Sequence, residues 1–508
     1  VWFSSDGATF TQLSPDRRVT AVPYALQAEE AKTAATAGDA DTLDGQHASA
    51  FYTQGGNSFG AVGILGTNDN YALEFEVNNG RALRLESGTS PNLIGGYSGN
   101  WVAPGVFGAV IGGGGQNGNL NRVVDHVGAV GGGQNNQAGS DDGNVGNNTL
   151  ATVAGGANNI ASGTLSAITG GSTNTASGYI STIAGGRSNM ATGSYSTISG
   201  GWSNTSSSNY AFVGGGYANQ VSGSGYGYST VAGGYQNIAT GDISFIGAGA
   251  YNQVNGGIYS AITAGANNVI TATGWANVIG GGYGHVISGT MGYAAIGGGR
   301  QNRADNSYVT IAGGRGNTAS GGYATVVGGQ DNAAPGSWAV VGGRANTVSG
   351  DYATVPGGVY ASATHFGEMA YASGGFAVAG DAQASTYVLR REYAMAPGTW
   401  HDLFLDGNGA SQRLTITPGR TVTFDILFTG RTAAGESAGY RIEGVVENVG
   451  GATSFVGTPI ITTLGEDDAA WDVQVLASDA LDALMPQVQG NGETIRWVAT
   501  VHTAEANW

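Results

Sequence analysis

Residues 179–193 read YISTIAGGRSNMATG, and residues 194–208 repeat this stretch as SYSTISGGWSNTSSS. The repeat is about fifteen residues long and runs from about Asn92 to about Gly358. Short repeats of this kind are typical of a solenoid, in which each unit buries its apolar side only against its neighbours. Four kinds of position follow the period: Ile168, Ile183, Ile198 and Val213; Gly171, Gly186, Gly201 and Gly216; Asn174, Asn189, Asn204 and Asn219; and Gly163, Gly178 and Gly193.

The unit is β rather than α. Each repeat has a β-branched apolar residue among Ser, Thr and Ala, then Gly-Gly, Asn and a further Gly. Glycine at this density disfavours a helix but suits corners that need a positive φ. Two short strands and two turns fill fifteen residues, so each repeat predicts one coil of a narrow parallel β-roll. From Leu93 to Val355 we expect about seventeen coils, a shaft about 80 Å long at about 4.8 Å per coil.

A roll this thin has little interior. It has room for Ile or Val and for small residues such as Ala161, Ala176 and Ala191, which is less than independent folding usually requires. We therefore expect an obligate homotrimer of rolls that share an apolar face. Such trimers could also join end to end as a filament.

The repeat also resembles a known family. The run STIAGGRSNMATG (181–193) is similar to the head repeats of trimeric autotransporter adhesins, and the resemblance covers about half of the chain. It implies a trimeric surface fibre that acts in attachment. The doubled glycine and the asparagine depart from that family's pattern, so handedness and coil dimensions do not carry over directly.

Composition favours an extracellular fibre. The chain has 93 Gly in 508 residues, 10% charged residues and no Cys, unlike an ordinary enzyme or a disulfide-stapled module. A net charge of −17, with Lys32 as the sole lysine, argues against nucleic acid or an anionic membrane as partner. No run of about eighteen apolar residues predicts a membrane span. The chain starts at Val1 without a signal peptide, so we expect the anchoring module upstream.

Two short regions precede the repeats. Residues 1–54 predict a hairpin over 1–20, with Ser5-Asp6-Gly7 as its turn, and a helical stalk at Tyr24–Ala37 after Pro23. Residues 55–91 predict an adaptor hairpin around Asn79-Gly80. The run TAVPYALQAEEA followed by ADTLDGQHASAFYT resembles a linker of bacterial surface fibres and phage tail-fibre-like proteins.

The repeats occupy residues 92–384, and a different pattern occupies 385–508. Alternating strands are expected at Val422–Gly430, Tyr440–Asn448, Trp471–Ala477 and Thr494–Thr503. Their spacing predicts an antiparallel β-sandwich or jelly roll, which we interpret as a tip domain. The region also resembles the C-terminal modules of phage tail fibres.

Catalytic motifs are weak in this sequence. The run Gly435-Glu436-Ser437-Ala438-Gly439 matches a nucleophile elbow, but two predicted strands flank it, which favours a plain turn. His365 and Glu368 lack a second histidine that would complete a zinc site. We therefore expect no catalytic, metal-binding or cofactor-binding residue and predict that the chain is not an enzyme. The six histidines show no ligand spacing: His47, His126, His285, His365, His401 and His502.

Two acidic runs have the ligand type that calcium prefers, namely Asp141-Asp142-Gly143-Asn144 and Glu466-Asp467-Asp468. Neither has a recognised spacing. We therefore expect no cofactor and interpret both runs as hydrated acidic loops. A bound calcium ion is the alternative.

Stacked coils also predict two side-chain ladders. The repeat asparagines should form an amide ladder at a turn, although Asn147 and Asn204 also stand in glycosylation sequons. An aromatic residue stands three positions before the inward Ile or Val of many coils and should point outward. It either packs against a neighbouring protomer or forms a flat platform for sugar rings. The aromatic residues are Tyr195, Tyr210, Tyr228, Tyr259, Tyr293, Tyr308, Tyr323, Trp338 and Tyr352.

The sequence therefore predicts a non-enzymatic subunit of an extracellular trimeric fibre that attaches to surfaces and binds a glycan or receptor. The alternative is a phage or phage-like tail fibre whose C-terminal domain binds a receptor. A polysaccharide-degrading β-helix is a third possibility, which we rank lower because no carboxylate pair recurs on one face.

Overall fold

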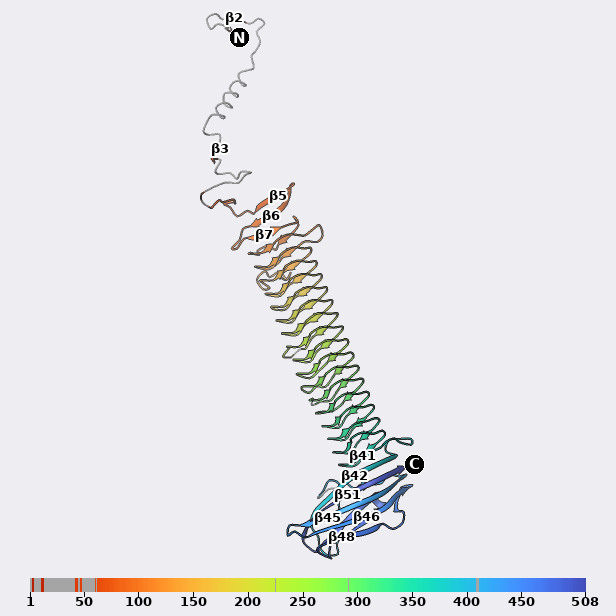
Figure 1. The fold of residues 1–508 in the computed structure, drawn as a ribbon. Helices are drawn as coiled ribbons and strands as arrows, with labels where there is room; N and C mark the ends of the chain where they lie inside the picture. The colour runs from red at the N-terminus through yellow and green to blue at the C-terminus, as the bar shows by residue number, and fades with distance from the viewer. Residues whose placement is uncertain are drawn as a thin grey trace. The chain divides into compact units, whose positions relative to one another are not determined.

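The computed structural model describes residue 60, residues 62–223, 225–290, 292–407 and 411–508, and the backbone of four short strands nearer the N-terminus (Figure 1). The chain divides into two units, Val1–Asn70 and Tyr71–Trp508. In the first unit, β1 (Trp2–Phe3) pairs antiparallel with β2 (Thr11–Gln12), as the predicted first hairpin requires, and β3 (Thr42–Leu43) pairs with β4 (Gln46–His47). The predicted helical stalk lies outside the described residues. No helix in the described part of the chain is long and apolar enough to cross a membrane.

A hairpin opens the second unit. β5 (Leu73–Val77) pairs antiparallel with β6 (Gly80–Glu86), which pairs with β7 (Asn92–Gly95). The two turn residues are Asn78 and Asn79, with φ of 52° and 58°, so the predicted Asn79-Gly80 turn is wrong by one residue. Asparagine tolerates the left-handed region better than most residues, and this leaves Gly80 free to start the strand.

The repeats form a parallel β-solenoid of about eighteen turns, close to the seventeen expected. Each coil contributes one strand to each of two parallel sheets, and most of these strands have only two residues. The first sheet contains β7, β9 (Val110–Ile111), β11 (Ala129–Val130), β13 (Thr152–Val153), β15 (Ala167–Ile168), β17 (Thr182–Ile183), β19 (Thr197–Ile198), β21 (Phe212–Val213), β23 (Thr230–Val231), β25 (Phe245–Ile246), β27 (Ala261–Ile262), β29 (Val278–Ile279), β31 (Ala295–Ile296), β33 (Thr310–Ile311), β35 (Thr325–Val326), β37 (Val340–Val341), β39 (Thr354–Val355) and β41 (Met369–Tyr371). The second sheet contains β8 (Trp101–Val102), β10 (Arg122–Val123), β12 (Gln137–Ala138), β14 (Ile160–Ala161), β16 (Thr175–Ala176), β18 (Met190–Ala191), β20 (Thr205–Ser206), β22 (Gln220–Val221), β24 (Ile238–Ala239), β26 (Gln253–Val254), β28 (Val269–Ile270), β30 (Val286–Ile287), β32 (Arg303–Ala304), β34 (Thr318–Ala319), β36 (Ala333–Ala334), β38 (Thr347–Val348) and β40 (Ser362–Ala363).

Coil length varies while the strand register does not. Ala129 pairs with Thr152 in the longest step along the first sheet, and Val340 pairs with Thr354 in the shortest. Extra residues therefore accumulate in the turns between strands, and equivalent strand residues still stack.

Alternation along each strand decides which side chains are inside. Ile183 and Ile198 on the first sheet and Ala176 and Ala191 on the second are 0% exposed, whereas Thr197 is half-buried on the outer side. The predicted inside and outside positions are confirmed. Because these apolar residues are already buried within one chain, the thin interior does not by itself require three rolls, and the homotrimer stays a prediction.

The asparagine ladder lies inside one corner of the solenoid. Asn189 donates from Nδ2 to the carbonyl oxygens of Gly185 and Gly201, both at 3.0 Å, and its Oδ1 accepts the backbone N–H of Asn204 at 3.0 Å. The ladder thus satisfies backbone groups that the tight corner leaves without strand partners. Gly186 lies at the same corner with φ of 87°, a conformation that favours glycine. The predicted amide ladder is present.

The C-terminal region consists of two antiparallel sheets around one core, as the sequence predicted. The larger sheet continues from β41 of the solenoid through β42 and β51 to the hairpins beyond them. The core includes Trp471, Trp497, Phe424, Phe428 and Tyr440. The larger sheet contains β42 (Ala382–Ala394), β51 (Thr494–Asn507), β45 (Arg420–Thr432), β46 (Ser437–Val449), β47 (Ala452–Phe455) and β48 (Ile460–Glu466); the smaller contains β43 (His401–Asp402), β44 (Leu414–Thr415), β49 (Asp472–Ser478) and β50 (Ala483–Gln489), and the 3-10 helix η2 (Asp479–Leu481) connects β49 to β50.

Candidate functional site

The nine aromatic residues gather at one corner of the coils, after each second-sheet strand and before the next first-sheet strand. We call them the aromatic corner: Tyr195, Tyr210, Tyr228, Tyr259, Tyr293, Tyr308, Tyr323, Trp338 and Tyr352. Their side chains are 41–55% exposed, so the predicted outward direction is confirmed. They do not lie in strands, however, because the two-residue strands are too short to include the position three residues before the inward Ile or Val. Each aromatic residue lies in the preceding turn and has a positive φ of 54–61°.

Most of the rings stack on one another in two runs. Tyr195, Tyr210 and Tyr228 have centroid separations of 4.8 and 4.6 Å with ring planes within 5° of parallel. Ile243, Tyr259 and Ala276 take the next three ladder positions. A second run follows them and comprises Tyr293, Tyr308, Tyr323, Trp338 and Tyr352, with centroids 4.6–5.0 Å apart. Stacked pairs contribute about 0.5–1.5 kcal/mol each beyond buried area.

Ring stacking determines which part of each aromatic side chain is accessible to a ligand. The faces of inner rings such as Tyr308 lie against neighbouring rings, so their outward surface is ring edges and phenol hydroxyls. Tyr228 ends the first run, because Ile243 takes the ladder position in the next coil. The pKa of the Tyr195 phenol is raised, first by desolvation and then by Tyr179 and Tyr210. The binding role of this corner stays a prediction.

The same corner is apolar but aliphatic nearer the N-terminus. Val127, Leu150, Leu165 and Ile180 occupy the ladder position with φ of 54–64°. A bulky or β-branched residue in the left-handed region is strained, and such strain often marks a position selected for its side chain. The opposite corner has a similar φ at Thr173, Ser188 and Ala218, so the left-handed conformation is a general feature of these turns.

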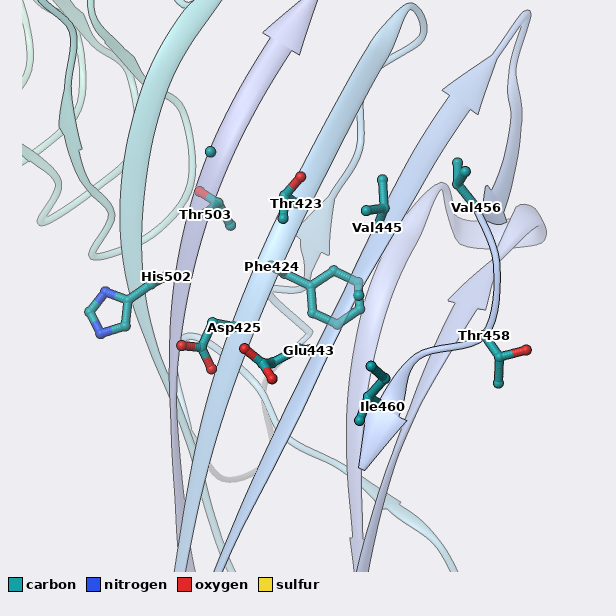
Figure 2. A pocket seen from close by; sticks show the side chains of 12 residues that line it. Thr423, Phe424, Asp425, Glu443, Val445, Val456, Thr458, Ile460, His502 and Thr503 are labelled. Carbon is teal, nitrogen blue, oxygen red and sulfur yellow. The ribbon is translucent and has the colours of Figure 1, made fainter. Parts of the chain in front are cut away.

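A groove crosses the outer face of the larger C-terminal sheet (Figure 2). It has a volume of about 470 Å³, and its floor is a row of three side chains on neighbouring strands: His502 of β51, Asp425 of β45 and Glu443 of β46. Arg441 forms ion pairs with Asp425 at 2.9 Å and with Glu443 at 2.8 Å, and the Asp425 hydrogen bond raises the pKa of the Arg441 guanidinium. Thr386 lies 3.2 Å from the His502 ring. The row offers carboxylate acceptors and an imidazole to hydroxyl groups of a ligand.

The sequence did not predict this row. Asp425 and Glu443 are eighteen residues apart, but they face each other because β45 and β46 form a hairpin whose register is symmetrical about Ala434. A prediction that paired the two strands residue by residue from that turn would have placed the two carboxylates opposite each other. The expectation that no carboxylate pair recurs on one face concerned the coils of the solenoid, and this single pair lies in the C-terminal sheet instead.

The predicted motif His365-x-x-Glu368 forms a buried joint between the last coil and the C-terminal sheets. His365 Nδ1 lies 3.1 Å from Glu368, and its Nε2 lies 2.9 Å from the Thr415 hydroxyl. Ser385 and Tyr387 also donate to the Glu368 carboxylate, at 2.8 and 3.1 Å. Burial raises the pKa of Glu368, but the hydrogen bond and charge of His365 outweigh it and bring the pKa below the usual value. Through these contacts the pair links the last coil to the C-terminal sheets.

The remaining histidines are dispersed among the described residues. His126 stacks on Phe107 with centroids 4.0 Å apart, and His401 packs against Tyr393. His285 replaces an asparagine of the ladder: its Nδ1 accepts the Asn302 N–H at 3.1 Å. The side chain of His47 lies outside the described residues.

The other predicted motifs have structural roles. Ser437 of the elbow-like run starts β46 in a β hairpin, and no helix follows it. Asn204 is fully buried, with its Nδ2 bound to the Gly200 and Gly216 carbonyls, so its predicted glycosylation is wrong for the folded chain. Asn147 is exposed, and glycosylation there stays a prediction.

The acidic runs are hydrogen-bonded within the protein. Asp142 accepts the Asn144 N–H and the Asn147 amide, and Glu466 accepts the Tyr440 hydroxyl. The described residues contain no group of three or more His, Asp or Glu side chains placed to hold a metal ion. Calcium binding therefore stays a prediction.

No family model and no curated protein matches the chain. Two similar solved structures are the tailspike protein gp49 of Acinetobacter baumannii bacteriophage Fri1, a capsular polysaccharide depolymerase, and the tailspike protein of Acinetobacter phage vB_ApiP_P1. The first is 9% identical over 79% of each chain, with a TM-score of 0.20. The second is 9% identical over 82% of this chain and 81% of that chain, with a TM-score of 0.22.

The prediction that the chain is not an enzyme is contradicted by this comparison, since one of the two tailspikes is a depolymerase. We therefore withdraw it. At these TM-scores the likeness gives this chain no activity, substrate or catalytic residue. The β-solenoid itself is confirmed, while the resemblance to adhesin heads finds no matching family model.

Proposed function

We propose that the chain is the shaft and tip of an extracellular or virion-borne attachment fibre that binds surface glycan along its aromatic corner. The observation that carries the proposal is the second run of stacked, half-exposed rings from Tyr293 to Tyr352. The run extends over five coils, or about 20 Å at the spacing of parallel strands. A cell-surface adhesin and a phage tail fibre both fit this proposal.

The rings stand at a strained corner of the coil. A left-handed conformation costs a non-glycine residue about 1–2 kcal/mol, whereas one stacked pair returns about 0.5–1.5 kcal/mol. Stacking therefore offsets the strain only in part. Ring edges, C–H surfaces and phenol hydroxyls together suit a sugar chain, which presents alternating C–H and hydroxyl groups.

The test uses the full chain and immobilised neutral polysaccharides such as dextran, mannan and galactan. Tyr293, Tyr308 and Tyr323 are replaced together by Asn, which tolerates the left-handed region. We expect binding to a recognised glycan to fall at least tenfold. Leu165→Asn is the matched control, because it removes an apolar side chain from the same corner position. Unchanged binding by the triple variant would overturn the proposal.

The competing explanation is packing between protomers. We propose a homotrimer, for which light scattering should give a mass about three times 50.8 kDa. If the triple tyrosine variant dissociated while the Leu165 control remained trimeric, the aromatic corner would be an interface between chains and the glycan proposal would fail.

Cleavage of the bound glycan is a second candidate function, favoured by the Asp425–Glu443 pair in the groove of Figure 2. Glycoside hydrolysis generally uses two neighbouring carboxyl groups. Release of reducing ends from polysaccharide, lost in both Asp425→Asn and Glu443→Gln, would support it. Release that continued in both variants would place the reaction elsewhere.

A further inference from the structure

A second ladder occupies the other corner of each coil. This corner follows the Gly-Gly pair, and its residues lie one above another through single β-bridges. Near the C-terminal end of the solenoid the bridged positions are Tyr283, Arg300, Arg315, Gln330 and Arg344, which we call the arginine corner. It lies between a first-sheet strand and a second-sheet strand, whereas the aromatic corner lies at the next turn of the coil.

The charges at this corner lack counter-ions. Arg300, Arg315 and Arg344 are exposed, and among the described residues none has a carboxylate oxygen within 4.0 Å. By contrast, Arg303 at the end of the same turn forms an ion pair with Asp305 at 2.6 Å. These unpaired arginines lie on a chain with 35 acidic and 18 basic residues.

Stacking places like charges close together. Arg300 and Arg315 occupy adjacent coils, about 4.8 Å apart along the strands' pairing direction, and like charges directly opposite one another are destabilising. Gln330 separates Arg315 from Arg344. Its Nε2 donates to the Asp331 carboxylate at 2.8 Å, so this nearby carboxylate is hydrogen-bonded to the glutamine. An anion bound between Arg300 and Arg315 would relieve the repulsion between these like charges.

We propose that the arginine corner binds a carboxylate-bearing polysaccharide. Guanidinium groups bind carboxylates through two parallel hydrogen bonds, and a row of them fits a ligand with repeated acid groups. The Tyr283 ring, with the Arg300 guanidinium 5.8 Å from its centroid, adds an apolar surface at the end of the row. The inference rests on the proposed function in taking a glycan as ligand, but it depends on different residues.

The experiment measures binding of the full chain to polygalacturonate, to its fully methyl-esterified form and to the neutral glycan recognised by the aromatic corner. We expect polygalacturonate to bind with an affinity that falls as salt rises, and the ester to bind at least tenfold more weakly. Equal binding of acid and ester would overturn the inference.

Variants assign the site. R300Q/R315Q/R344Q should lose at least tenfold in affinity for polygalacturonate and keep its affinity for the neutral glycan. R390Q/R431Q/R496Q removes the same charge from the C-terminal sheets and should stay within twofold of the wild type. The melting temperature of R300Q/R315Q/R344Q should not fall, because like-charge repulsion is removed.

The outcomes separate the two proposals. Binding of neutral glycan without polygalacturonate refutes the arginine corner alone, and binding of polygalacturonate without any neutral glycan refutes the aromatic corner alone. A change of assembly mass in R300Q/R315Q/R344Q would show that acidic side chains of another copy occupy the corner, which also overturns the inference.

Discussion

Replacing Asn189 by alanine tests whether the asparagine ladder holds the coils together. The side chain is buried and makes three hydrogen bonds: to Gly185 O, to Gly201 O and from Asn204 N–H. Gly201 O keeps a second partner, the Arg187 N–H at 2.8 Å. The Asn204 N–H, in contrast, is buried and loses its acceptor.

The magnitude follows from these contacts. A buried donor left without a partner costs about 1–3 kcal/mol, and each further lost hydrogen bond costs about 0.5–1.5 kcal/mol. We therefore expect Asn189→Ala to lower the free energy of unfolding by about 2–6 kcal/mol. Asn189→Asp should be at least as damaging, because a carboxylate cannot donate to the two glycine carbonyls.

Urea unfolding and amide hydrogen exchange measure the effect. Coils in a solenoid depend on their neighbours, so protection should fall first in the strands on either side of Asn189 and less at the ends of the solenoid. Ser188→Ala is a poor comparison because Ser188 is half-buried and has a φ of 55°. The outward Met190→Ala, in β18, is the better control. A loss below about 1 kcal/mol for Asn189→Ala would refute this account of the ladder, since it is the lower bound for an orphaned buried donor.

Three further predictions concern the same coils. Gly186→Ala should destabilise the protein strongly, because its φ is 87° and a Cβ would collide with the next coil's backbone, while Gly185→Ala meets nothing within 4 Å and should be mild by thermal melting. Burial holds the pKa of His285 below its usual value, so the free energy of unfolding should fall as pH drops below about 6.5. Unfolding measured across this pH range should show a smaller loss of free energy in His285→Asn. Ile198→Asp, which buries an unpaired charge, should lower the melting temperature far more than Thr197→Asp; equal effects would mean that the outer face is covered by another chain.

Much of the solenoid could be predicted from the sequence. The fifteen-residue period sets the coil, and alternation about residues such as Ile198 sets which side chains are inside. The asparagine ladder followed from stacking alone. These features are local or repeat at a fixed spacing, so they can be predicted from a single sequence.

Other features depended on information that the repeat does not contain. The strands are only two residues long, so an offset of three placed Tyr308 in a left-handed turn and stacked its face on neighbours instead of leaving it open. The carboxylate pair of Asp425 and Glu443 required the hairpin register. Turn chemistry decided between Asn78-Asn79 and Asn79-Gly80, because asparagine can itself take a positive φ.

The constant register across coils of unequal length has an evolutionary consequence. Every coil offers its neighbours the same strand edges, whether the step between first-sheet strands is that of Ala129 to Thr152 or of Val340 to Thr354. Duplication or deletion of one whole unit in the gene would therefore splice into the stack without a mismatch, and the reach of the shaft would change in increments of about 4.8 Å. Reach and recognition can thus be selected separately, the first by the number of units and the second by the residues at their corners.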